Sequence, residues 1–203
     1  MVTHSGHSPF GFPAWNLSVS LARTSLPPPA AVGRFATVVG GPNDLLVWLE
    51  SQLGLHTPSD SPQRLSALSE AAATAIAQSG SLAIAASYNQ HPYAVVTRLL
   101  EHRDSYLMAL PLGAAAPAVP CIETCGHAAA KAASLPSLIQ EYAAVMAAAT
   151  AAQRDAIATA EPDRLARLFE AIDEGQRLPA CVIAIIDDRS EWPGRWKSLL
   201  DTI

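Results

Sequence analysis

The stretch FATVVGGPNDLLVWLESQLG, residues 35–54, decides how the fold can be interpreted. It begins with a short β-prone run, FATVV, which stops at a Gly-Gly-Pro turn. In the residues that follow, leucines and Trp48 recur at spacings of three and four, a polar pair can cap the start, and Gly54 can end the segment. The stretch therefore predicts a strand, a glycine turn and a helix.

The predicted turn stands where a phosphate-binding loop lies in nucleotide-binding domains, so Gly40, Gly41 and Asn43 are the candidate phosphate contacts. The turn has no Lys to reach the phosphates and no adjacent Ser or Thr to hold magnesium. Pro42 removes one amide donor, and Asp44 places negative charge where phosphate would lie. ATP hydrolysis is not expected here. An ordinary β-to-α turn and a remnant of a nucleotide fold that binds weakly or not at all both remain open.

A second buried strand is predicted from the run CVIAII, residues 181–186, whose unbroken apolar character is typical of a parallel strand covered on both faces. Asp187 and Asp188 follow it, in the position of magnesium-binding acids in nucleotide hydrolases. The simpler alternative is that these are solvated acids at a turn that caps the next segment. A terminal helix is expected over 193–202.

Helical periodicity dominates the block between the two strands, residues 61–175, with the interval 112–133 expected as a loop. Residues 1–31 are predicted to be irregular, with at most one short strand in WNLSVSLA, and 32–203 to form a single domain. Two distant strands cannot form a stable sheet alone, so either the N-terminal residues supply more strands or a partner sheet is needed. We expect a predominantly helical α/β fold with a small or incomplete parallel sheet.

The composition narrows the functional classes. Of 203 residues, half are hydrophobic, and 13 Lys and Arg face 18 Asp and Glu for a formal charge of −5. This balance excludes extensive disorder and disfavours a stand-alone DNA-binding module. No signal peptide or transmembrane segment is evident, and three cysteines do not form a paired framework, so a soluble cytoplasmic protein is expected.

The cysteines suggest little chemistry by themselves. The segment CIETCGH places Cys121, Cys125 and His127 within seven residues. A closed zinc site normally needs four ligands, so free cysteines in a loop are the favoured interpretation, ahead of a metal site or a nucleophilic cysteine. No catalytic residue, metal site or cofactor is assigned from the sequence.

Four phrases in order are similar to the N-terminal region of a bacterial family of PD-(D/E)XK nucleases related to the AddB subunit of AddAB-type helicase-nucleases. The phrases are VVGGPNDLLVWLESQLGL (38–55), SYNQHPYAVVTRLLEHRDSYL (87–107), EPDRLARLFEAIDEGQRLP (161–179) and VIAIIDDRSEWPGRWKSLL (182–200). The resemblance implies a degenerate P-loop helicase domain, inactivated by decay of its ATP loop. The family's nuclease residues and iron-sulfur cysteines match no position here.

The resemblance therefore implies a non-catalytic module with a scaffold role in DNA-end processing and double-strand break repair. Its partner would be a helicase-nuclease subunit or the remainder of a parent protein. Any DNA contact would come from local pairs, Arg98 with Arg103 or Arg164 with Arg167. The alternative for these arginines is a solvated helix face with nearby acids. A small interaction protein with no DNA role is the second hypothesis, and the thiol or metal enzyme the third.

Overall fold

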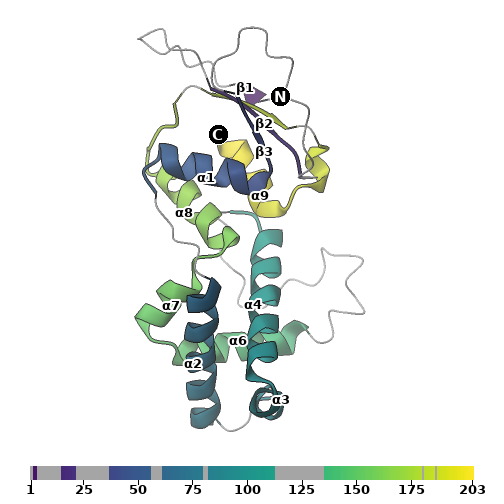
Figure 1. The fold of residues 1–203 in the computed structure, drawn as a ribbon, viewed down its shortest axis with the longest axis vertical. Helices are drawn as coiled ribbons and strands as arrows, with labels where there is room; N and C mark the ends of the chain where they lie inside the picture. Colours follow the sequence, from purple (N-terminus) through teal and green to yellow (C-terminus); the bar gives the residue numbers. More distant parts are fainter. Residues whose placement is uncertain are drawn as a thin grey trace. The chain divides into compact units, whose positions relative to one another are not determined.

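The chain divides into two compact units in the computed structural model (Figure 1). The sheet unit comprises residues 1–57 and 164–203, and the helical unit comprises residues 58–163. The structure describes residues 2–3, 15–21, 37–55, 61–79, 82–112, 135–179, 181–185 and 187–203.

The sheet unit contains a four-stranded sheet in the order β1-β4-β2-β3. Strand β2 pairs in parallel with β3 on one side and with β4 on the other, whereas β1 runs antiparallel to β4. The predicted small parallel sheet is thus present, with an antiparallel edge. The strands are β1 (Val2–Thr3), β2 (Trp15–Val19), β3 (Thr37–Gly40) and β4 (Cys181–Ile185).

The short strand that WNLSVSLA allowed is present as β2, whereas β1 departs from the irregular segment predicted over residues 1–31. WNLSV lies at the centre of the sheet, between the two strands that the sequence predicted. A strand in that position satisfies its backbone N–H and C=O groups on both sides, which two isolated strands cannot do. Of the two ways to complete the sheet, the N-terminal residues supplying more strands is the one observed.

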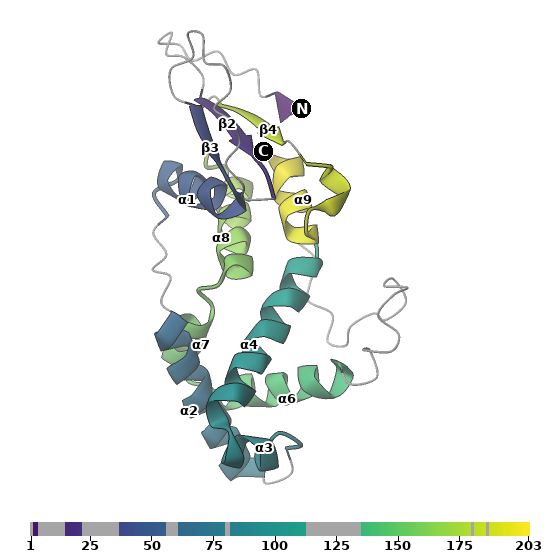
Figure 2. The same ribbon diagram turned by 45° about the vertical axis from the view of Figure 1, so that its right-hand side comes forward.

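The core of the sheet unit lies where the strands meet three helices, α1 (Pro42–Gln52), α8 (Glu161–Asp173) and α9 (Gly194–Thr202). These helices gather on one side of the strands in both views (Figures 1 and 2). Leu17 of β2 is paired in register with Ile183 of β4, and both are buried. Burial on both faces of β4 is not seen throughout, because Ala184 and Ile185 are only half-buried. The 3-10 helix η2 (Arg189–Glu191) connects β4 to α9.

The helical unit packs around α2 (Ser61–Ser79), α4 (Pro92–Ala109) and α6 (Leu135–Ala148). Alanines on the inner face of α2 are fully or almost fully buried, and small side chains let neighbouring helices approach closely. Two shorter helices complete the described part of the unit, α3 (Ala85–Gln90) and α7 (Ala151–Ile157). None of the helices the structure describes is long and apolar enough to cross a membrane.

The predicted domain organisation differs from the observed one in two respects. The expected single domain over 32–203 is two units, and the helical block 61–175 contributes α8 largely to the sheet unit. Within that block α6 ends at Ala148, and Thr150, whose hydroxyl accepts from the Gln153 N–H, starts α7 as a new helix. The expected loop over 112–133 lies outside the described residues except at its first residue.

Candidate functional site

The turn between β3 and α1 holds a carboxylate of the protein itself. Gly41 is the N-cap of α1, Pro42 occupies the first helical position, and Asp44 lies in the first turn. The Oδ2 atom of Asp44 accepts a hydrogen bond of 2.8 Å from the Gly41 N–H. An amide that would be available to an anion at the start of a helix is therefore already satisfied by Asp44.

Gly40 lies directly beneath the same side chain. A Cβ atom placed on Gly40 would lie 2.6 Å from Asp44 Cβ and 2.8 Å from Asp44 Cγ, closer than real Cβ contacts. The carboxylate thus covers the end of β3. Because a phosphate would need the same space and the same amide, Asp44 excludes it both sterically and by charge.

Asn43, the third candidate phosphate contact, is oriented toward an arginine of the sheet unit. Its Oδ1 atom lies 3.4 Å from Arg164 Nη1. Arg164 in turn donates through Nε to Glu50 Oε1 at 2.8 Å, and its second donor reaches Glu50 Oε2. The side chains of Arg164 and Glu50 are only 9% and 7% exposed, so this cation is committed to a buried ion pair between α8 and α1.

The sequence does not reveal the role of Arg164, because both interpretations of Arg164 with Arg167, a DNA contact or a solvated helix face, place the arginine at the surface. A signal was present in α1: Glu50 lies four residues after Leu46 and on the same buried stripe as the leucines. A carboxylate on an apolar stripe requires a buried cation or a hydrogen-bond donor. Nothing local identifies Arg164 as that cation, because it lies more than a hundred residues further along the chain.

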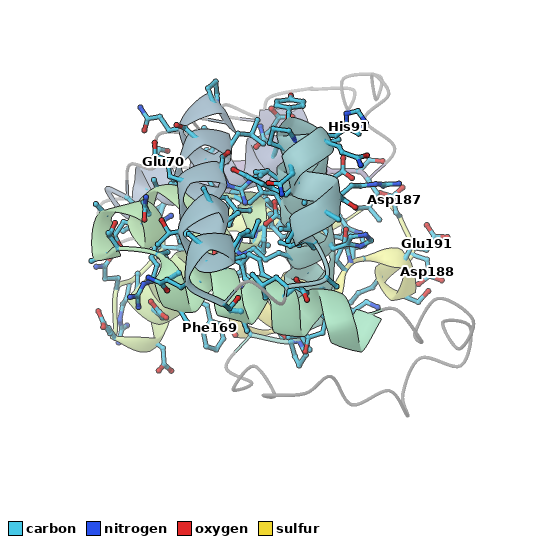
Figure 3. All side chains as sticks on the ribbon, turned by 90° about the horizontal axis from the view of Figure 1, so that it is seen from below. Glu70, His91, Phe169, Asp187, Asp188 and Glu191 are labelled. Atoms are coloured by element: carbon cyan, nitrogen blue, oxygen red, sulfur yellow. The ribbon has the colours of Figure 1, made fainter. Side chains whose placement is uncertain are left out.

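The acids after β4 act as structural hydrogen-bond acceptors. Asp187 accepts from the Ser20 hydroxyl at 3.1 Å and from the Leu21 N–H, both just after β2. Asp188 accepts from the Ser190 N–H at 2.9 Å and caps η2, as the simpler alternative predicted (Figure 3). That backbone bond, with smaller contributions from the Ser190 hydroxyl and the Lys197 charge, holds the pKa of Asp188 below its ordinary value.

Metal ligation receives no support from the described part of the chain, where no three His, Cys, Asp or Glu side chains converge. Cys121, Cys125 and His127 lie outside the described residues. Cys181 is a buried free thiol on β4, and burial raises its pKa, which disfavours the reactive thiolate.

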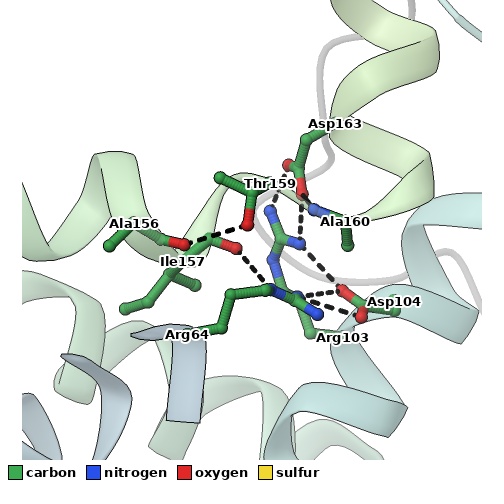
Figure 4. Close-up of polar contacts among 8 residues, drawn as sticks. All are labelled: Arg64, Arg103, Asp104, Ala156, Ile157, Thr159, Ala160 and Asp163. Atoms are coloured by element: carbon green, nitrogen blue, oxygen red, sulfur yellow. Dashed lines mark hydrogen bonds and ion pairs between the residues drawn. The ribbon is translucent and has the colours of Figure 1, made fainter. Parts of the chain in front are cut away.

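The two arginines proposed to contact DNA have different environments within α4. Arg98 is 74% exposed and pairs with Glu101 at 3.3 Å, the i,i+3 contact expected of a solvated helix face. The Arg103 side chain is only 11% exposed. Its Nη1 atom donates to Asp163 and, at 2.8 Å, to Asp104 Oδ1 (Figure 4). The structure does not present them as one basic pair.

Arg103 belongs to a buried polar network of the helical unit. Arg64 binds both carboxylate oxygens of Asp104, at 2.9 and 3.0 Å, and its Nε donates to the Ile157 carbonyl at the end of α7 (Figure 4). Burial opposes the charge of Arg103, but hydrogen bonds to Asp163 and the charge of that carboxylate outweigh it and raise the arginine's pKa above its ordinary value. Two arginines and two aspartates balance one another here, so no net charge is left for a ligand.

The sequence was also compared with models of known protein families, with curated proteins and with solved structures, and none of them matches. In the described residues, carboxylates repeatedly occupy backbone amides that could otherwise bind an anion: Asp44 at Gly41, Asp163 at Ala160, and Glu141 at Ala83 and Ile84.

Proposed function

We propose that the chain is a non-catalytic scaffold module of a DNA-end-processing protein, similar to the inactivated helicase domain of AddB-type helicase-nucleases. The observation that supports this proposal is the occupation of the β3–α1 turn by Asp44. The strand, glycine turn and helix follow one another in the order of a nucleotide-binding fold. The turn lacks the Lys and the hydroxyl of a phosphate loop, and a carboxylate lies over the end of the strand. Decay of a phosphate loop would leave this arrangement.

Two further features are consistent with a role that does not require nucleotide. Arg164, the cation that reaches the first turn of α1, is committed to Glu50. Asp187, in the position of a magnesium-binding acid, is committed to the end of β2. The proposed partner is a helicase-nuclease subunit or the remainder of a longer parent protein, and the proposed location is the cytoplasm.

Nucleotide binding tests the inactivated turn directly. Titration of the protein with Mg-ATP in a calorimeter should give no saturable heat, and no phosphate release should be detected. Asp44→Asn keeps the size of the side chain but removes its charge, and it should also remain without ATPase activity because the turn has no Lys. Saturable binding by the wild-type protein, with turnover lost in Asp44→Asn, would overturn the proposal.

The repair role needs a separate experiment in the strain of origin. Deletion of the gene should increase killing by ionising radiation, and the wild-type gene should restore survival. The Asp44→Asn gene should restore it equally, because a scaffold does not depend on the chemistry of the turn. Full radiation resistance in the deletion strain would favour the second hypothesis, an interaction protein with no DNA role.

A further inference from the structure

We infer that residues 58–163 are an inserted domain that folds and unfolds on its own, separately from the sheet unit into whose chain it is inserted. The inference concerns the cooperativity of the molecule and goes beyond the proposed function. It rests on how each unit closes upon itself.

The two chain segments of the sheet unit are joined directly through the centre of the sheet. Strand β2, from the first segment, and β4, from the second, pair in parallel over five residues, from Trp15 opposite Cys181 to Val19 opposite Ile185. Asp187 adds hydrogen bonds to the residues that follow β2. These contacts need nothing from the residues in between.

A second connection lies at the point of insertion. Glu50 is on α1, the last helix before the helical unit, and Arg164 is the first residue of the sheet unit after it. Their ion pair, with a 2.8 Å hydrogen bond, is buried inside the sheet unit. Loss of either partner of a buried ion pair strongly destabilises the folded protein. The contact therefore holds the two segments of the sheet unit together without help from the residues between them.

The helical unit closes on itself in the same way. Arg64, near its beginning, donates to the carbonyl of Ile157, near its end, at 2.9 Å. Asp163, its last residue, is bound by Arg103 of α4. An early and a late segment of the unit are therefore in direct contact, which is the geometric condition for a domain to be inserted into a loop of another.

The helical unit also has a hydrophobic core of its own. At 106 residues it lies within the size range of independently folding domains. The buried members of its core cluster all come from the unit itself: Ala67, Leu68, Ala71, Ala72, Ala75, Ile84, Val96, Leu99, Leu100, Val145, Ala149 and Ile157. An autonomous domain is expected to have a core of its own, a polar network of its own and contact between its early and late segments.

Hydrogen exchange of the full-length chain tests this inference with a matched pair of variants. Ile157 is buried in the helical unit and Ile183 in the sheet unit. Ile157→Val should accelerate exchange of the slowest amides of the helical unit about 2- to 13-fold and leave those of the sheet unit unchanged. Ile183→Val should do the reverse.

A stronger pair keeps the test decisive. Leu68→Ala and Leu165→Ala each remove a fully buried leucine, from the helical and the sheet unit respectively, and the acceleration should exceed about 30-fold in the unit that carries the change. The aromatic residues give a second measurement, because all four Trp lie in the sheet unit and all four Tyr in the helical unit. Trp fluorescence should report a lower denaturation midpoint only for Leu165→Ala, and Tyr absorbance only for Leu68→Ala.

Acceleration in both units by either member of a pair would overturn the inference, since the chain would then unfold as one cooperative body. A leucine variant that leaves its own unit unchanged would overturn it equally. Neither result would bear on nucleotide binding or radiation survival, so failure here is distinguishable from failure of the proposed function.

Discussion

At the scale of single residues, Gly40 and Asp44 determine the character of the β3–α1 turn together. The carboxylate satisfies the Gly41 amide only because position 40 has no side chain, since a Cβ there would meet Asp44 at 2.6 Å. Glycine at this position is therefore required by close approach and not by an unusual backbone angle. The two residues should be energetically coupled.

We predict that Gly40→Ala lowers the free energy of unfolding by about 1–3 kcal/mol, because the new methyl group displaces Asp44 from the Gly41 amide. In an Asp44→Gly background, which removes the clashing atoms, the same change should cost much less. Denaturant unfolding followed by Trp fluorescence gives the free energy of unfolding of each member of this double-mutant cycle. Equal costs of Gly40→Ala in the two backgrounds would mean that Asp44 does not lie over the strand end.

Asp188 provides a pH-dependent test at the same scale. Its pKa is lowered from its ordinary value of 3.8 in the folded protein, with the Ser190 N–H as the largest cause. The stabilisation is therefore complete above about 3.8 and is lost as the pH falls through the lower, folded pKa. NMR titration of the Asp188 carboxyl should show a midpoint below 3.8. Ser190→Ala, which removes the hydroxyl but keeps the N–H, should move the midpoint part of the way back, and an unchanged midpoint would assign the shift to other groups.

At the scale of elements, the ion pair between Glu50 and Arg164 fixes α1 against α8. The leucine stripe and the Gly54 stop predict α1 from the sequence, but the helix starts earlier than expected, with Gly41 as its N-cap in place of Asn43 or Asp44. Which helix a buried carboxylate faces is not visible, because ion-pair partners depend on tertiary packing. The same limit explains why neither interpretation of Arg103, as a DNA contact or as part of a solvated face with Arg98, anticipates its place among Asp104 and Asp163.

Arg164→Met should lower the free energy of unfolding of the sheet unit by about 3–5 kcal/mol, because it leaves Glu50 buried without a cation. The double variant Glu50→Leu/Arg164→Met removes both charges and should be more stable than Arg164→Met alone. Trp fluorescence during urea unfolding is the measurement. Arg98→Met is the matched control, since its pair with Glu101 is exposed and its loss should cost less than about 1 kcal/mol. A double variant as unstable as Arg164→Met would show that the unpaired Glu50 carboxylate is not the cause of the lost stability.

At the scale of the whole molecule, the sequence reveals elements but not their grouping. β3, β4, α2, α4 and α9 follow from periodicity and capping signals, and the glycine turn follows from its position between strand and helix. The central place of β2 does not follow, since pairing between Trp15 and Cys181 is a long-range event that no local window contains. The division into two units depends on that pairing. The break before α7 could have been found, because Thr150 and Gln153 form a capping box.

The distribution of charge over the molecule leads to the last prediction. The helical unit carries five Lys and Arg against nine Asp and Glu, a formal charge of −4, and the sheet unit eight against nine, a charge of −1. Arg64 and Arg103 are neutralised internally, so neither can release counterions from DNA. Binding of a short DNA duplex at physiological salt should therefore be weaker than about 10⁻⁴ M, measured by fluorescence anisotropy.

The exposed cations give this prediction its control. Arg98→Gln removes an exposed candidate contact, and Arg154→Gln removes another exposed arginine of the helical unit. If the molecule works as a scaffold, both variants should leave the weak anisotropy signal unchanged, because one phosphate contact cannot offset a surface with excess negative charge. Micromolar binding with a steep salt dependence that Arg98→Gln reduces and Arg154→Gln does not would restore Arg98 as a DNA contact. That result would also mean that the module binds DNA directly.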